Sequence, residues 1–200
     1  MTFSSEEESI PNHAALTLKT IMQCELLNTE HASLRMAETL DSCTRNVKIV
    51  PDIKSIDELP PEPSADILIL PGGAPGAKTF CEDGRVQRLI QSYRAAGKHV
   101  AFICAATTAL VASTKWAAKI GGLKFSEKAR VTSHPSVKKE ILDAGWQYAP
   151  DEERVVVDDK VITSRGPGTA MLFGLTIVEE LVGKAKRDEI TGPLICAKEL

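Results

Sequence analysis

Apolar runs alternate with turn residues along most of this chain. Two continuous apolar runs, residues 66–70 and 99–103, have the length and composition of strands buried on both faces. The first runs into Pro71-Gly72-Gly73, and the second runs directly into Cys104. A shorter alternating stretch at 47–50 stops at a proline and predicts a further strand.

Helical patterns lie between and after these strands. Apolar residues spaced at i, i+3, i+4 and i+7 from Val86 predict a helix that Asp83 caps and Gly97 ends. Further helices are expected over 105–118, from Ser136 to Gly145 and over 169–182.

Two short apolar runs, 155–157 and 161–163, flank Asp158-Asp159 and predict a hairpin. A short strand is expected at 130–133, and residues 121–128 form a predicted surface excursion. Strand and helix in this order predict a doubly wound, mostly parallel α/β sheet with helices on both faces.

The first part of the chain fits this alternation poorly. Residues 14–21 favour a helix and 21–26 a short strand, whereas 28–41 show no clear period. We therefore interpret 1–41 as a divergent or shortened N-terminal segment and 42–200 as the α/β domain. Together they make a single domain, since 200 residues suit one domain of this class.

Composition and charge argue against several classes of protein. Charged residues make up 26% of the chain and the net charge is -3, which argues against a dedicated nucleic-acid surface. No apolar run is long enough to span a bilayer, and the acidic start does not resemble a secretory signal. The number of cysteines is odd, and none are paired at metal-ligand spacing; they are Cys24, Cys43, Cys81, Cys104 and Cys196. This pattern favours reduced thiols and a cytoplasmic address, with the nucleus also compatible.

Cys104 is the strongest candidate for chemistry. It lies where a buried strand turns at once into a helix, at the sheet edge where open α/β folds bind ligands. Ala105 and Ala106 are small enough for a tight turn, and the first helical N–H groups favour a thiolate over a thiol. The alternative is a small buried hydrophobic residue, which is the commoner fate of a cysteine and the one expected for the other four.

Other residues near this edge are candidates for a supporting role. The backbone N–H groups of Gly73 and Ala105 could form an oxyanion hole, or Gly73 could belong to a plain turn. Arg165 could hold an anion there, or be a solvated arginine. His134 could exchange protons with Cys104, and the run Glu6-Glu7-Glu8 could supply a carboxyl. A lone histidine and a terminal charge run are more often structural or solvated.

Four ordered motifs give the chain a family resemblance: residues 66–73 (DILILPGG), 103–106 (ICAA), 131–135 (VTSHP) and 162–169 (ITSRGPGT). With 42–47 (SCTRNV) they resemble the PfpI-like (ThiJ/PfpI) superfamily of flavodoxin-like, glutamine-amidotransferase-like proteins. The nearest branch is similar to the Parkinson-disease protein deglycases and their fungal and bacterial relatives. The resemblance covers about residues 42–196.

The resemblance implies an activity and roles for particular residues. It implies a cofactor-independent glyoxalase (methylglyoxal to lactate, a D-lactate dehydratase of the glyoxalase III type) or a protein deglycase. Cys104 would be the nucleophile, His134 would lie beside it, and Gly73 and Ala105 would donate to the oxyanion. Arg45 and Arg165 are the candidates for substrate binding. No metal or organic cofactor is implied, and a homodimer is.

The catalytic acid is less clearly indicated. In the family, the last glutamate of a Glu-Glu-x-Glu segment touches the cysteine. Counting from the acidic run places Ser9 at that position, whereas counting back from Ile10-Pro11 points to Glu7. Glu7 is our prediction, with Glu8 and His134 as alternatives.

Two other functions compete with the enzyme. The same cysteine, oxidised to the sulfinate, could serve a redox-sensing, chaperone-like protein that turns over nothing. A cysteine peptidase or amidase would need a well-aligned Cys–His pair. An acid beside Cys104 favours the glyoxalase, and its absence favours the redox sensor.

Overall fold

The computed structural model describes residues 41–42, 48–49, 55–59, 63–120 and 128–196. Two short antiparallel strands, β1 (Asp41–Ser42) and β2 (Lys48–Ile49), precede the main sheet, and β2 lies within the strand predicted at 47–50. The helix expected over 14–21 and the strand expected over 21–26 lie outside the described residues.

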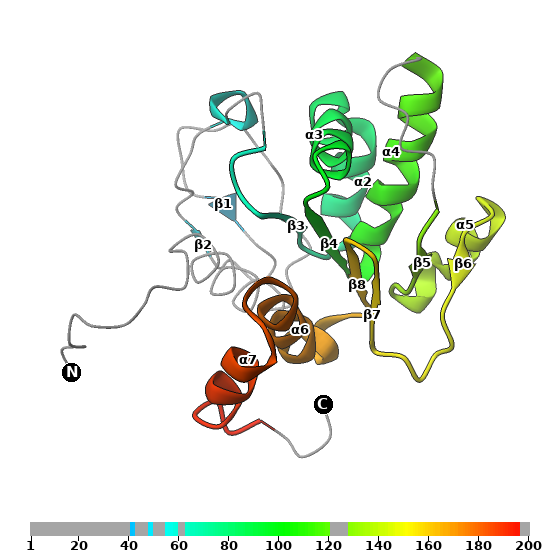
Figure 1. Ribbon diagram of the computed structural model, residues 1–200. Helices are drawn as coiled ribbons and strands as arrows, with labels where there is room; N and C mark the ends of the chain where they lie inside the picture. Colours follow the sequence, from blue (N-terminus) through cyan, green and yellow to red (C-terminus); the bar gives the residue numbers. More distant parts are fainter. Residues whose placement is uncertain (1–40, 43–47, 50–54, 60–62, 121–127, 197–200) are drawn as a thin grey trace.

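A four-stranded sheet in the order β3-β4-β8-β7 forms the centre of the molecule (Figure 1). The strands β3 (Ile67–Leu70), β4 (His99–Ile103) and β8 (Val161–Ser164) run parallel, and β7 (Val155–Asp158) is antiparallel to β8. Both predicted buried strands and the predicted hairpin are confirmed. Asp159 makes the hairpin turn with a φ of 52°, in the left-handed region that short polar side chains tolerate.

Helices cover both faces of this sheet (Figure 1). One face carries three helices, α2 (Ala74–Glu82), α3 (Gly84–Ala95) and α4 (Thr107–Ile120). The other face carries α6 (Ala170–Val182), and α7 (Lys184–Thr191) packs on α6. The structure therefore has the doubly wound, mostly parallel α/β architecture that the sequence predicts.

A small unit extends the molecule beyond β7. Its two parallel strands are β5 (Arg130–Val131) and β6 (Gln147–Tyr148), and α5 (Lys138–Asp143) connects them. The predicted strand at 130–133 is thus shorter than expected. The predicted helix from Ser136 is also confirmed in shortened form, because a 3₁₀ turn at Pro135–Val137 precedes α5.

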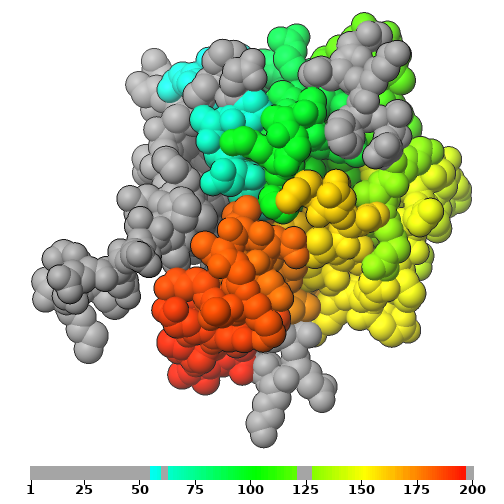
Figure 2. Space-filling model, viewed as in Figure 1, coloured from blue at the N-terminus to red at the C-terminus, as the bar shows by residue number. Residues whose placement is uncertain are grey.

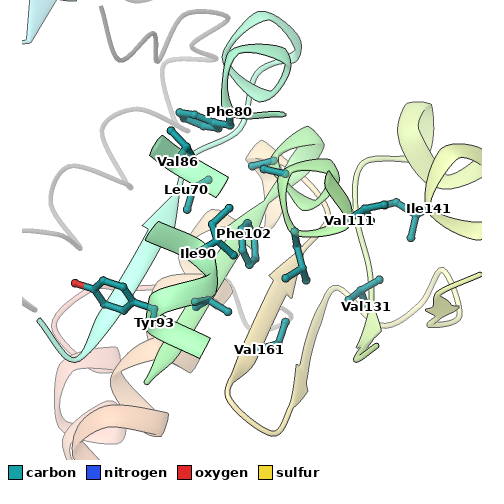
Figure 3. Close-up of a cluster of buried hydrophobic side chains, with 14 of the residues drawn as sticks. Leu70, Phe80, Val86, Ile90, Tyr93, Phe102, Val111, Val131, Ile141 and Val161 are labelled. Atoms are coloured by element: carbon teal, nitrogen blue, oxygen red, sulfur yellow. The ribbon is translucent and has the colours of Figure 1, made fainter. Parts of the chain in front are cut away.

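The central strand β4 divides the core between the two faces. Val100 and Phe102 pack with α3 and α4 on one side, as Figure 3 shows for Phe102, whereas Ala101 and Ile103 pack against α6 on the other. All five residues of β4 are buried. This full burial explains why the sequence of β4 is a continuous apolar run rather than an alternating one.

Two helices were not predicted. The sequence of α2 begins with Ala-Pro-Gly, which resembles a turn, but proline is tolerated in the first helical turn. Gly183, with a φ of 92°, ends α6 as predicted and also starts α7, which lies on the outside of the molecule (Figure 2). Among the described residues, no helix is long and apolar enough to cross a membrane.

Candidate active site

Three turns leave the sheet side by side at its carboxyl edge. Leu70 of β3 pairs with Phe102 of β4, and Ile103 of β4 pairs with Ser164 of β8. Because these strands are parallel, the residues that follow them emerge together. They are the Gly72-Gly73 turn, Cys104 and the loop that begins at Arg165. This is the sheet edge at which open α/β folds place their ligands.

Cys104 is held in a backbone conformation that suits a nucleophile at a sharp turn. Its φ is 64°, which costs a non-glycine residue roughly 1–2 kcal/mol relative to a right-handed conformation. It opens a 3₁₀ turn, Cys104–Ala106, that leads into the 14-residue helix α4. The Cys104 side chain is partly exposed, whereas Ala105 and Ala106 are buried. A thiol in this place is accessible and lies next to the positive end of a helix.

Gly73 also has a positive φ, 106°, and it immediately precedes α2. The helix α2 contacts the 3₁₀ turn of Cys104, whereas the Cys104 side chain packs against the hydrophobic cluster on the α6 face. The carbonyl of Gly73 accepts from the Ala77 N–H at 2.9 Å, which fixes the turn. The donor roles of Gly73 and Ala105 stay predictions.

His134 is tied to the cysteine turn through the backbone. Its N–H donates to the Cys104 carbonyl at 3.2 Å, although the two residues are far apart in sequence. Its Nδ1 accepts from the Ser136 N–H at 3.3 Å and lies 2.8 Å from the Ser136 Oγ. Because Nδ1 is the acceptor, the neutral imidazole carries its proton on Nε2. A Cβ added at Gly166 would lie 3.6 Å from the ring carbon Cδ2, so the ring packs against the loop after β8.

The model of the DJ-1/PfpI family matches residues 15–180 of this chain. The chain belongs to the DJ-1/PfpI family. The match begins within the segment interpreted as divergent, and the boundary at 41/42 stays a prediction.

Curated relatives agree with this membership. The chain is 38% identical over 153 residues to the Parkinson disease protein 7 homolog of Danio rerio, covering 76% of this chain and 75% of that protein. It is 36% identical over 156 residues to the glutathione-independent glyoxalase DJR-1.2 of Caenorhabditis elegans, covering 78% and 75%. It is 37% identical over 126 residues to the glutathione-independent glyoxalase DJ-1 of Schizosaccharomyces pombe, covering 62% and 59%.

Solved structures show the same fold. Drosophila melanogaster DJ-1beta superposes with a TM-score of 0.70 at 30% identity, covering 94% of this chain and 92% of that one. Schizosaccharomyces pombe DJ-1 superposes with a TM-score of 0.67 at 31% identity, covering 80% of each chain. The flavodoxin-like fold of the DJ-1/PfpI family is therefore the fold of this protein.

Arg165 lies at this edge of the DJ-1/PfpI fold, but its guanidinium already has protein partners. Its Nη1 lies 3.2 Å from the Asp151 Oδ1 and also donates to the Asp151 carbonyl. Lys138 bonds to the same carboxylate at 2.9 Å and, with Arg165, lowers the pKa of Asp151 below its usual value. A substrate role for Arg165 stays a prediction, and Arg45 lies outside the described residues.

Cys81 differs from Cys104 in its surroundings. It lies on α2, where its Sγ donates to the Thr108 Oγ1 at 3.4 Å, and burial raises the pKa of its thiol. Such a thiol is less reactive than an accessible one beside a helix N-terminus. Glu7 and the neighbouring glutamates lie outside the described residues. Among the described residues, no group of three or more His, Cys, Asp or Glu side chains could hold a metal ion.

Sequence reasoning missed the polar side chains that hold the His134 segment in place: Thr107, Tyr148 and Thr163. Tyr148 belongs to a strand of two residues, which is too short to show a period, and Thr107 and Thr163 lie within apolar runs. For the two threonines, Thr107 and Thr163, their position beside known motifs is the signal that could have indicated them. Thr107 follows the ICAA motif and Thr163 lies within ITSRGPGT.

Proposed function

We propose that this member of the DJ-1/PfpI family is a cofactor-independent glyoxalase or protein deglycase that uses Cys104 as its nucleophile. The observation that carries the proposal is the left-handed Cys104 at the carboxyl edge, bonded through its carbonyl to the His134 N–H. Two relatives at 36% and 37% identity are named glutathione-independent glyoxalases, and this supports a small reactive carbonyl as the substrate.

The proposed reaction converts methylglyoxal and one water into lactate. The Cys104 thiolate adds to the aldehyde carbon and the carbonyl oxygen takes up a proton, which gives a hemithioacetal. The aldehyde-derived carbon then loses its C–H proton and its hydroxyl proton, while the neighbouring carbonyl gains one proton on carbon and one on oxygen, which leaves a lactoyl thioester on Cys104. Water attacks the thioester, lactate leaves, and the thiol is restored. No electron acceptor is needed, because one carbon is oxidised as its neighbour is reduced.

Two kinds of group support these steps. Backbone N–H donors at Gly73 and Ala105 would stabilise the negative oxygen of the adduct. The proton transfers need an acid–base group, worth typically about 10²–10⁴-fold in rate. His134 could supply one through its Nε2–H, and Glu7 is the carboxyl that the family resemblance implies.

The same site suits a deglycase, in which the thiolate attacks the early adduct of a glyoxal with an amine or thiol. We include in the proposal a homodimer, a cytoplasmic location and the absence of a metal or organic cofactor. The second candidate function is a redox sensor. The partly exposed Cys104 beside a helix N-terminus favours it, because that setting also promotes oxidation of a thiol.

The test is lactate formation from methylglyoxal by purified wild type, Cys104→Ser and Cys81→Ser. We expect Cys104→Ser to lose turnover entirely and Cys81→Ser to keep it within about twofold, since partial burial raises the pKa of the Cys81 thiol. Turnover in Cys104→Ser would remove the covalent mechanism. An inactive wild type whose Cys104 is still readily oxidised would favour the redox sensor.

A further inference from the structure

Side chains from other elements fix the backbone just before His134. The Thr132 N–H donates to the Thr163 Oγ1 of β8 at 2.9 Å, and the Thr107 Oγ1 of α4 donates to the Thr132 carbonyl at 3.1 Å. The segment has left β5 at this point, so these hydroxyls replace the hydrogen bonds of a sheet.

Ser133 is held by a single phenol. Its N–H donates to the Tyr148 Oη at 3.0 Å, and the Tyr148 hydroxyl donates to the Ser133 carbonyl at 3.0 Å. The Ser133 Oγ lies 2.9 Å from the same phenol oxygen and donates to the His134 carbonyl at 3.0 Å. Both backbone polar groups of Ser133 therefore depend on one hydroxyl of β6.

The next residue connects this phenol to the nucleophile turn. The His134 N–H donates to the Cys104 carbonyl, and Cys104 has the strained φ of 64°. A strained residue keeps its conformation only when its surroundings determine it. The peptide between Ser133 and His134 is part of those surroundings, and Tyr148 sets where that peptide lies.

On its outer side, the Tyr148 ring is connected to the loop after β8 through Lys138 and Asp151. The Lys138 Nζ lies 4.9 Å from the ring centroid and bonds to Asp151, which in turn pairs with Arg165. Asp151 is exposed in both ion pairs, and an ion pair with an exposed partner contributes little to stability. The hydroxyl bonds on the inner side are therefore the part of the arrangement that fixes the site.

We infer that Tyr148 is a positioning residue for the Cys104 site, acting through the Ser133–His134 peptide on the Cys104 turn and the His134 ring. Its effect on turnover rests on the proposed function, whereas its effect on thiol reactivity does not.

The first experiment compares Tyr148→Phe with Tyr93→Phe. The Tyr148→Phe variant keeps the ring but loses the hydroxyl, and Tyr93 is the only other tyrosine of the chain. Tyr93 is a buried residue of α3 whose hydroxyl bonds to the Ala65 backbone, so its variant controls for the loss of a phenol elsewhere. Alkylation of Cys104 by iodoacetamide is followed against pH by peptide mass mapping, together with kcat and KM for methylglyoxal.

For Tyr148→Phe we expect the midpoint of Cys104 alkylation to move upward by about 0.3–0.7 pH unit, because the turn is less firmly aligned with the helix N-terminus. We also expect kcat to fall about tenfold with KM unchanged within about twofold. Tyr93→Phe should change neither quantity. An unchanged alkylation profile in folded Tyr148→Phe, or the same change in Tyr93→Phe, would overturn the inference. Loss of lactate formation in every protein would contradict the proposed function, while the alkylation profiles would still decide the role of Tyr148.

A second measurement leaves the hydroxyl in place. In a Tyr93→Phe background, fluorotyrosine labels Tyr148 alone, and its fluorine resonance reports on the phenol. We expect this resonance to shift when Cys104 is alkylated, because the two residues are connected through one peptide. A resonance that stays unchanged would contradict the connection even if Tyr148→Phe fails to fold.

Discussion

Cys104 and Gly73 are two described residues of the carboxyl edge whose φ is positive, 64° and 106°. A backbone with positive φ costs a side chain stability, and it persists only where the surrounding structure determines it. Each of these positions therefore indicates a structural requirement of the turn in which it lies. At Cys104 the requirement is a strand that must turn into α4 while keeping its thiol accessible. At Gly73 it is the close approach of the α2 N-terminus to the same edge.

Gly73→Ala should lower both stability and activity. The added Cβ in a backbone with a φ of 106° should reduce the free energy of unfolding by about 1–2 kcal/mol. Chemical denaturation measures this change, and lactate formation should fall further than the stability loss explains if the Gly73 N–H is an oxyanion donor. Gly168→Ala is the control, because Gly168 has no positive φ and a Cβ there meets nothing within 4 Å. Equal effects of both variants would refute the special role of Gly73.

Cys104 should also be the first thiol that hydrogen peroxide oxidises, and it should stop mainly at the sulfinate. Its partial exposure beside the start of α4 favours oxidation, whereas burial raises the pKa of the Cys81 thiol and protects it. Peptide mass mapping after mild oxidation gives the order. Earlier modification of any other cysteine would remove the basis of the redox-sensor hypothesis.

At the scale of elements, long patterns were predicted well and short ones poorly. The buried strands β3 and β4 were predictable because four consecutive apolar residues, 67–70 and 100–103, are hard to place elsewhere, and Asp83 accepts from the Arg85 N–H as a helix cap should. The strand β6 has two residues and no period, so neither it nor the bonds of Tyr148 could be foreseen. The strand-to-helix position of Cys104 was visible in the sequence, but its left-handed φ was not.

The start of β4 carries a pH-dependent contribution to stability. His99 is about 8% exposed, and its Nε2 lies 3.9 Å from the Glu180 carboxylate. Burial, followed by the charge of Lys160, lowers the pKa of His99 below its ordinary value of 6.5, against the opposing effect of Glu180 and other carboxylates. The unfolded chain therefore takes up a proton first as the pH falls, and the folded state loses stability through this window.

His99→Gln should weaken that dependence. Between about pH 7 and pH 5 the wild type should lose more free energy of unfolding than the variant, because glutamine binds no proton. Urea denaturation at several pH values measures the difference, and His134→Ala, which changes a histidine of the other sheet edge, is the control. A variant with the same pH slope as the wild type would show that His99 does not titrate in the way described.

Across the whole molecule, the two edges of the main sheet differ: the amino edge contributes to stability, and the carboxyl edge carries the candidate site. The amino edge, where β4 and β8 begin, contributes to stability through buried groups such as His99. The carboxyl edge gathers the turns after β3, β4 and β8, and the His134 N–H, from the segment that follows β5, donates to the Cys104 carbonyl there. The proposed activity therefore requires that the thiol presented at this second edge forms a covalent bond with the substrate.

Peptide mass mapping of protein mixed with methylglyoxal and quenched in acid during the first turnovers tests this claim most directly. We expect an adduct with the composition of one methylglyoxal on the peptide that carries Cys104, and none on that peptide in Cys104→Ser. The adduct should disappear as the substrate is consumed and lactate accumulates. Lactate formation with no adduct on Cys104, or with a transient adduct on another cysteine, would contradict the account.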